Sequence, residues 1–456
     1  MSSQEIALMK VIRSMLYAHL LVLFFQIPLR ELIVDSTIWR DIGVLLITLL
    51  GILLLVKKGG KYRISSLDSL IFAYIFYGVI NFIADAFTTS NVVDAVKYFR
   101  NHFLPFFIYF PAKYAFDNST NQKNFIKFIF FIFLVYVTTP IIEVLLTAIS
   151  FPLSSIPWYR YSFNQGDRFV ASGGYINPED SPILGLLGFP HYTVAAMVCI
   201  FALQLPFLLT AKGAKETRHS RPFKLTSISY LSYLYISLLI IAILIFGVRV
   251  HVVSTFLIIV LSVRYLKLEG KAIAINIFIA IALYFLFNLL FTTTLSDMYS
   301  QFMGYLLGNG EQSSLSAILS FDDILFVINS PLSNFIFGSG YDVISGTEFD
   351  LIANSTGWEI KLIFYTAVYG LIWLMLFFLI CQKGFKYAND CINNFSQNSF
   401  QSLYAIGFKL MLIVLLIDAC HYMRMMTWPI LDFWIICLAI LSSIHAKEKV
   451  SLKGIK

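Results

Sequence analysis

The sequence predicts an all-α fold, a polytopic transmembrane helix bundle of about 12 spans, on three observations. Hydrophobic residues make up 58% of the chain and charged residues only 13%, and the mean hydropathy is +0.78, unlike a soluble globular protein. Apolar runs long enough to cross a bilayer recur along the chain. Lysines and arginines fall mainly on alternate sides of these runs. The predicted spans are 12–29, 42–56, 69–87, 98–116, 126–150, 183–210, 228–246, 250–264, 272–292, 360–381, 402–420 and 428–445.

The charge distribution predicts how the spans are oriented. Positive residues stay on the cytoplasmic side of inserted helices, and with the N-terminus inside, 24 of the 33 Lys and Arg fall on that side, among them those of segment 212–224. We therefore expect both termini in the cytoplasm and read the net charge of +7 as topology, with no reason to invoke nucleic acid. The nine outer residues are Arg30, Arg40, Lys97, Arg100, Arg160, Arg168, Arg249, Lys361 and Arg424.

The chain is expected to form a single integral membrane domain, 1–456, with two long outer loops, 151–182 and 293–358. The first apolar run lacks a small-residue cleavage site, so we expect it to remain as a span. The larger loop contains an amphipathic stretch, Ser313 to Ser330. This pattern is typical of an interfacial helix, and equally of a helix that packs on the bundle.

The cysteines and the histidine within the first span are expected to be structural. The five cysteines lie mostly inside predicted spans without metal-ligand spacing, which is typical of small apolar packing residues, so we expect neither a disulfide nor zinc. His19 is expected to be a hydrogen-bonded core residue.

The outer arginines are candidate anion ligands. Arg249 lies at the turn between the seventh and eighth predicted spans with almost no loop around it. It must snorkel, form an ion pair with a loop carboxylate, or bind an anion. Guanidinium binds oxygen pairs in a fork, which suits a diphosphate. The candidate diphosphate ligands are Arg249, Arg168, Arg160, Arg424 and Arg100.

Four short motifs occur in the chain order and at the topological positions of one family. They are Lys97–Asn101 followed by Leu104–Pro105, Gly188–His191, Phe246–Arg249, and Pro331 with Gly338–Gly340. With this layout, the chain resembles the O-antigen polymerase and O-antigen ligase superfamily. Gly370 matches a further glycine of the ligase branch, whereas Thr356–Trp358 stands where that branch carries a histidine. This departure favours a polymerase over a ligase.

The resemblance implies a GT-C-like membrane glycosyltransferase in the bacterial inner membrane, with the long loops in the periplasm. It would polymerise undecaprenyl-diphosphate-linked repeat units of O-antigen, capsule or exopolysaccharide, without metal or cofactor. The partners implied are the lipid-linked donor and acceptor glycans, the bilayer and a chain-length regulator protein. Arginines would stabilise the departing diphosphate, and a base would take the acceptor proton. The candidate bases are Glu348, Asp350, Glu359, His191 and His421, with Glu348 and Asp350 preferred.

Other functions stay open from the sequence. The nearest alternative is an O-antigen ligase, the rival from another class is a lipid-linked oligosaccharide flippase or transporter, and a structural subunit of an export complex is a third. Coupled carriers place ionisable residues near the middle of their spans, whereas Asp85, Glu143 and Asp418 lie toward outer span ends. This distribution favours a site that faces outward.

Overall fold

The structure is a computed structural model of the chain. The described residues are 2–26, 28–29, 38–57, 64–88, 92–149, 151, 186, 190–210, 229–246, 249–266, 331–339, 361–419, 426 and 429–453.

The described residues are helical and include no strand. A helix satisfies every backbone hydrogen bond within its own segment, which an apolar surrounding demands. The helices are α1 (Ser3–Phe24), α3 (Ile38–Lys57), α4 (Ser66–Thr88), α5 (Val92–His102), the 3₁₀ helix η1 (Leu104–Ile108), α6 (Tyr109–Ala115), α7 (Ser119–Ala148), α9 (Pro190–Thr210), α10 (Ser229–Phe246), α11 (Arg249–Leu266), α16 (Leu332–Phe337), α19 (Lys361–Asn394), α20 (Phe400–Ala419) and α21 (Ile430–Lys453).

Eight of the described helices are long and apolar enough to cross a membrane, namely α1, α3, α4, α7, α9, α19, α20 and α21. The all-α membrane fold is thus confirmed at this level. Helices α10 and α11 form where two further spans were predicted, and His251–Leu266 of α11 is a shorter apolar helix. The predicted span 272–292, the amphipathic stretch 313–330 and most of both long loops lie outside the described residues.

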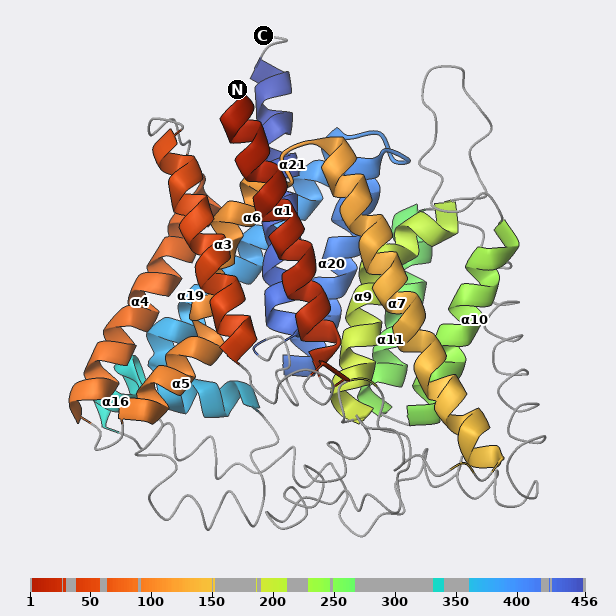
Figure 1. Ribbon diagram of the computed structural model, residues 1–456, viewed down its shortest axis with the longest axis horizontal. Coiled ribbons are helices and arrows are strands. Elements are labelled where there is room, and N and C mark those ends of the chain that lie inside the picture. Colours follow the sequence, from red (N-terminus) through yellow and green to blue (C-terminus); the bar gives the residue numbers. More distant parts are fainter. Residues whose placement is uncertain are drawn as a thin grey trace.

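The predicted span 98–116 is a departure, because it is not one helix. Helix α5 ends at His102, and Pro105 lies in the first turn of η1, which then leads into α6. Proline lacks the N–H that a continuing helix would need, and its ring clashes with the preceding turn. The chain therefore changes direction between α5 and α6, as Figure 1 shows.

The helices run between two ends of the bundle (Figure 1). We name the end where α1 begins at Ser3 and α21 ends at Lys453 the terminal end, and the end where α1 finishes at Phe24 and α3 begins at Ile38 the distal end. Helices α9, α11, α19 and α21 also begin at the distal end, where α5 and α16 lie (Figure 1). The alternation agrees with the predicted order of spans.

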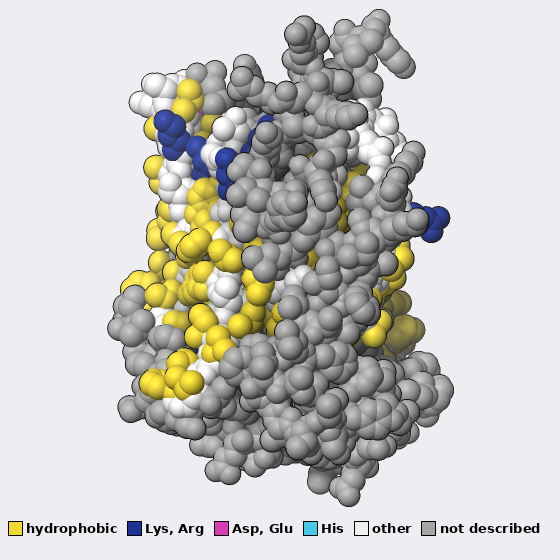
Figure 2. Space-filling view, turned by 90° about the vertical axis from the view of Figure 1, so that its right-hand side faces the viewer, with side chains coloured by type: hydrophobic (Ala, Val, Ile, Leu, Met, Phe, Trp, Pro, Cys, Tyr) yellow, Lys and Arg dark blue, Asp and Glu magenta, His cyan; other side chains and the backbone are white. Residues whose placement is uncertain are grey.

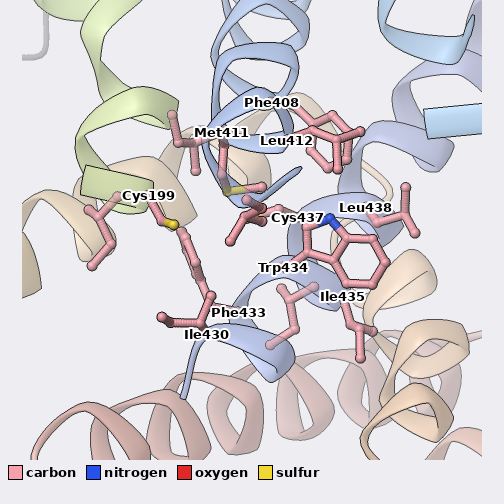
Figure 3. Packing of buried hydrophobic residues seen from close by; sticks show 14 of the residues in the cluster. Cys199, Phe408, Met411, Leu412, Ile430, Phe433, Trp434, Ile435, Cys437 and Leu438 are labelled. Atoms are coloured by element: carbon pink, nitrogen blue, oxygen red, sulfur yellow. The ribbon is translucent and has the colours of Figure 1, made fainter. Parts of the chain in front are cut away.

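The core of the bundle lies among α9, α20 and α21. The membrane-length windows of α9 and α21 are 89% buried, against 28% for α3 and α4. Figure 3 shows Cys199 of α9 beside Phe433 of α21, with Met411 of α20 and Cys437 of α21 between it and Trp434. A Cβ on Gly407 of α20 would overlap the backbone of Leu203 in α9, so a glycine there allows the close helix approach typical of membrane bundles.

The periphery has the surface of a lipid-facing protein. Phe72, Phe76, Ile80, Ile83 and Phe87 form an exposed stripe on α4 at helical spacing. On the face shown in Figure 2, hydrophobic side chains cover the middle of the described surface, and the Lys and Arg lie nearer the terminal end.

Candidate functional site

A buried cluster of charged side chains lies at the distal end where α1, α3 and α21 meet. His19 Nε2 of α1 lies 2.9 Å from Asp432 Oδ1 of α21, and the Arg40 guanidinium of α3 lies 3.6 Å from Asp432 Oδ2. All three side chains are buried. The prediction that His19 is a hydrogen-bonded core residue is confirmed. A buried carboxylate is tolerable only when it is paired, so Asp432 ties these three helices together.

Helix α5 joins this cluster through Asn101. Arg40 donates to the Asn101 side-chain oxygen at 3.2 Å and to its backbone oxygen at 3.3 Å. The next residue back, Arg100, lies 3.4 Å from Asp41, with its side chain one-third exposed. We name His19, Arg40, Asp41, Arg100, Asn101 and Asp432 the distal cluster.

The distal cluster is not saturated by its own contacts. Arg40 Nε, Arg100 Nε and Asp432 Oδ2 are buried and have no hydrogen-bond partner in the part of the chain that the structure describes. Buried polar atoms are normally satisfied, so such atoms need an explanation in a native protein. The cluster therefore has the capacity to make further polar contacts.

His102 connects α5 to two other parts of the distal end. One of its ring nitrogens, Nδ1, lies 3.1 Å from the backbone oxygen of Met426, between α20 and α21. The imidazole also packs edge-on against Tyr365 and Tyr369 of α19, with ring centroids 5.0 and 5.8 Å apart. The first turns of α19 are thus fixed against α5.

Two glycines join the described part of the predicted motif segment, 331–339, to α19. Gly370 interrupts α19 with φ 80° and ψ 173°, and Gly338 ends α16 with φ 91°. A Cβ on Gly338 would overlap the Val368 carbonyl, and one on Gly370 would overlap the Ile336 carbonyl. Only glycine allows both the positive φ and the approach of the two backbones. We name this contact the glycine joint.

The glycine joint also satisfies backbone groups freed by the interruption of α19. Ser339 N donates to Ala367 O at 2.9 Å. The Tyr77 hydroxyl of α4 lies within hydrogen-bond distance of Tyr369 O, at 2.5 Å, and of Phe337 O, at 3.2 Å. Tyr77 therefore bridges the two backbones that meet at the joint.

A second buried pair lies at the distal end, between α11 and α20. His251 Nε2 is 3.8 Å from Asp418 Oδ1, and both side chains are buried. His251 follows Arg249, the first residue of α11, by two positions. Helix α9 begins at Pro190 with His191 in its first turn, and it packs on α11 and α20. The starts of α9 and α11 thus meet the distal end of α20.

The structure describes only some of the predicted site residues. Arg100 lies in the distal cluster, and the backbones of His191 and Arg249 lie in first helical turns at the distal end. Glu348, Asp350, Glu359, Arg160, Arg168, His421 and Arg424 lie outside the described residues.

Sequence reasoning missed Asp432 and the buried pair of Asp68 and Lys113. Lys113 Nζ lies 2.7 and 2.8 Å from the two Asp68 oxygens near the terminal end, and the Tyr109 hydroxyl donates to Asp68 at 2.9 Å. Both aspartates occupy the third position of an apolar helix. A carboxylate that close to the start of a predicted span was the available signal, because it demands a partner inside the bundle.

The four described cysteines, Cys199, Cys381, Cys391 and Cys437, are buried free thiols, which agrees with packing. Within the described residues, no group of three or more His, Cys, Asp or Glu side chains could hold a metal ion.

These features define a helical membrane protein with polar side chains gathered near the ends of its spans. Comparisons of the chain with models of known protein families, with curated proteins and with solved structures find no match.

Proposed function

We propose that this protein is a bacterial inner-membrane glycosyltransferase that polymerises undecaprenyl-diphosphate-linked oligosaccharide repeat units at the periplasmic face. One observation carries the proposal: the four motif segments that carry the family resemblance, far apart in sequence, all have described residues at the distal end of the bundle. These are α5 and η1, the start of α9, the start of α11, and Pro331–Ser339.

Such a reaction needs cationic groups for the leaving diphosphate and a base, and we propose that both lie at the distal end. Sugar transfer from a lipid diphosphate breaks the bond between the sugar's anomeric carbon and the diphosphate oxygen. A bond to an acceptor hydroxyl oxygen then forms, and the diphosphate leaves with its lipid. Guanidinium groups stabilise the charge that develops on the leaving diphosphate. Arg249 and Arg100 are the ligands we propose from the described part of the chain, and Arg160, Arg168 and Arg424 are the other candidate ligands.

A general base would take the proton of the acceptor hydroxyl. Glu348 and Asp350 remain our preferred candidates, and Glu359, His191 and His421 are the others. His191 lies in the first turn of α9, and α9 packs on α11 and α20, the helices that carry the His251–Asp418 pair, which supports its place among the candidates. The glycine joint holds Gly338 and Ser339 against α19, and Glu348 follows Ser339 by nine positions in the sequence.

The positions of the buried ion pairs weigh against a coupled transporter. Asp68 and Asp432 are each third in their helices, and Asp418 is next to last in α20. His445 and Asp390 pair at 3.1 Å toward the terminal end. Proton or ion relays need such groups in the middle of the bilayer, and these described pairs lie near the two ends instead. A polymerase with about 12 spans and both termini in the cytoplasm therefore remains our proposal, ahead of a ligase or a flippase.

Arg249 provides the test. Arg249→Ala should abolish polymer while the protein level in the membrane stays near that of the wild type. Arg249→Lys should also give little polymer, because an ammonium group cannot replace the guanidinium fork. Polymer is measured as the ladder of chain lengths on a gel, in cells that lack the native gene.

Arg264→Ala is the matched control, since Arg264 lies in the last turn of the same helix at the terminal end. It should leave the ladder unchanged. A normal ladder from Arg249→Ala, or an equal loss from Arg264→Ala, would contradict the proposal. A normal ladder from Arg249→Lys would show that charge alone matters at this position.

A further inference from the structure

A groove with a volume of about 570 Å³ lies between α19 and α20 on the outside of the bundle. Its apolar lining includes Leu374, Met375, Phe378, Leu379 and Phe385 of α19 and Leu416 of α20. Met375 is 56% exposed and Phe378 43%. Both helices are candidate membrane spans, so these side chains would face lipid in a bilayer. The volume falls within the range of roughly 300–1,000 Å³ for ligand sites.

The exposed face of α19 that lines the groove becomes basic toward the terminal end. Residues 375, 378, 379, 382 and 385 recur at the three- and four-residue spacing of one helix face, and Lys386 and Asn389 continue that face. Both are exposed. The apolar groove is therefore followed, along the same face of α19, by a basic side chain toward the terminal end.

Helix α20 adds a second ammonium group at that position. Lys409 Nζ donates to Asn389 Oδ1 at 2.9 Å and lies 4.4 Å from the centroid of the Tyr265 ring of α11. The neighbouring carboxylate, Asp390, is 3.1 Å from His445 Nε2. We name Lys386 and Lys409 the basic rim, since both lie toward the terminal end of the groove. The positive charge of the basic rim is complementary to an anion.

We propose that the groove and the basic rim bind one anionic phospholipid, with an acyl chain along Phe378 and Leu379 and the phosphate at Lys386 and Lys409. Three observations select this occupant. The groove opens on the lipid-facing surface, its apolar part is continuous with the rim, and the rim lies toward the terminal end. Lysines reach from apolar helix surfaces to the headgroup level in the same manner. Anionic lipids attract basic residues near the membrane surface. The site is independent of the proposed glycosyltransferase reaction.

The test measures lipid selectivity of the purified full-length protein. Native mass spectrometry, with phosphatidylglycerol and phosphatidylcholine of identical acyl chains added to the detergent, reports the affinity for each. The wild type should prefer phosphatidylglycerol. Lys386→Gln with Lys409→Gln should weaken phosphatidylglycerol binding by about fivefold per lysine and leave phosphatidylcholine binding unchanged.

Two further variants keep the test decisive. The double variant Lys10→Gln with Lys57→Gln is the control. It removes one exposed lysine of α1 and one of α3, both toward the terminal end, and it should retain the preference for phosphatidylglycerol. Leu379→Trp fills the groove from a partly exposed position and should weaken binding of both lipids. The proposal is overturned if the wild type shows no preference, if the control pair loses it equally, or if Leu379→Trp binds both lipids as the wild type does.

Discussion

Buried charged side chains have different hydrogen-bond partners at the two ends of the bundle. At the terminal end, Asp68 accepts from Lys113 through both oxygens and from Tyr109, so its carboxylate is surrounded by donors. At the distal end, Arg40, Arg100 and Asp432 each keep a buried polar atom without a hydrogen bond among the described residues. A closed pair of the first kind holds helices together, whereas an unsaturated network of the second kind retains capacity for a ligand.

The ends also differ in backbone conformation. The distal end holds both described glycines with positive φ, Gly338 and Gly370. Residues in such conformations cluster at functional sites, where the surrounding structure must hold them. Gly384 of the same helix α19, nearer the terminal end, lies within regular helix. The difference indicates that the distal end is shaped for more than helix packing.

The largest effect should come from the glycine joint. Gly338→Ala and Gly370→Ala each introduce a Cβ that overlaps a backbone carbonyl, and the φ and ψ of these two glycines cost a side chain about 1–3 kcal/mol even without the overlap. We expect loss of the monodisperse protein on size-exclusion chromatography in detergent. Gly384→Ala is the control. Its Cβ would lie 3.3 Å from Phe408 and 3.4 Å from Leu438, so it should remain folded. If all three variants elute alike, the distinction between the two glycines of the joint and Gly384 is contradicted.

Charge removal should affect the two ends differently. Asp68→Asn leaves the Lys113 ammonium buried without its counter-ion, and breaking such a pair costs about 3–5 kcal/mol of unfolding free energy. Asp432→Asn keeps an oxygen for His19, and Arg40 keeps both Asn101 and the favourable charge of its neighbour Asp41, so the loss should be smaller, about 1–2 kcal/mol. Thermal unfolding in detergent measures both.

The activity readout should run in the opposite order. Asp432→Asn should reduce polymer more than its stability loss explains, whereas Asp68→Leu with Lys113→Met should recover stability and normal polymer, because an apolar pair can replace a buried ion pair. The opposite result would be an Asp432→Asn variant that is as destabilised as Asp68→Asn and that loses polymer only in proportion to its loss of stability. That result would show that the distal cluster has a purely structural role.

Tyr77→Phe should have the smallest effect. It removes the hydroxyl that reaches Phe337 O and Tyr369 O and leaves the ring in place. The expected loss is about 1 kcal/mol, seen as faster proteolysis near residues 331–339 with little change in global unfolding temperature. Unchanged proteolysis would show that the glycines hold the joint without Tyr77.

Much of the fold could be predicted from hydropathy, whereas the contacts between helices could not. The predicted span 402–420 corresponds to α20 (Phe400–Ala419), since a long apolar run leaves a chain in lipid few options other than a helix. Helix α7 begins at Ser119, before the predicted 126, because its first turns are polar and hydropathy does not detect them. The predicted span 98–116 is not one continuous helix, because at Pro105 the apolar character continues but a regular α-helix cannot.

The site was predictable only in part for a related reason. His19 could be expected to have a partner, but Asp432 lies 413 positions away, and no local pattern connects them. Gly338 and Gly370 were both noted in the sequence, yet their contact depends on how α16 packs against α19. Periodicity assigns residues to faces of elements, and it does not say which faces meet.

The measurement that most directly tests the central claim, that the distal end faces outward and the terminal end faces the cytoplasm, is labelling of single cysteines in intact cells. Ser333→Cys on α16 and Ser3→Cys on α1 are both exposed positions, at the distal and terminal ends respectively. The wild type, with four described cysteines buried, is the blank. A membrane-impermeant maleimide should label Ser333→Cys in intact cells and Ser3→Cys only after permeabilisation. The reverse pattern would contradict the orientation and the proposed periplasmic reaction with it.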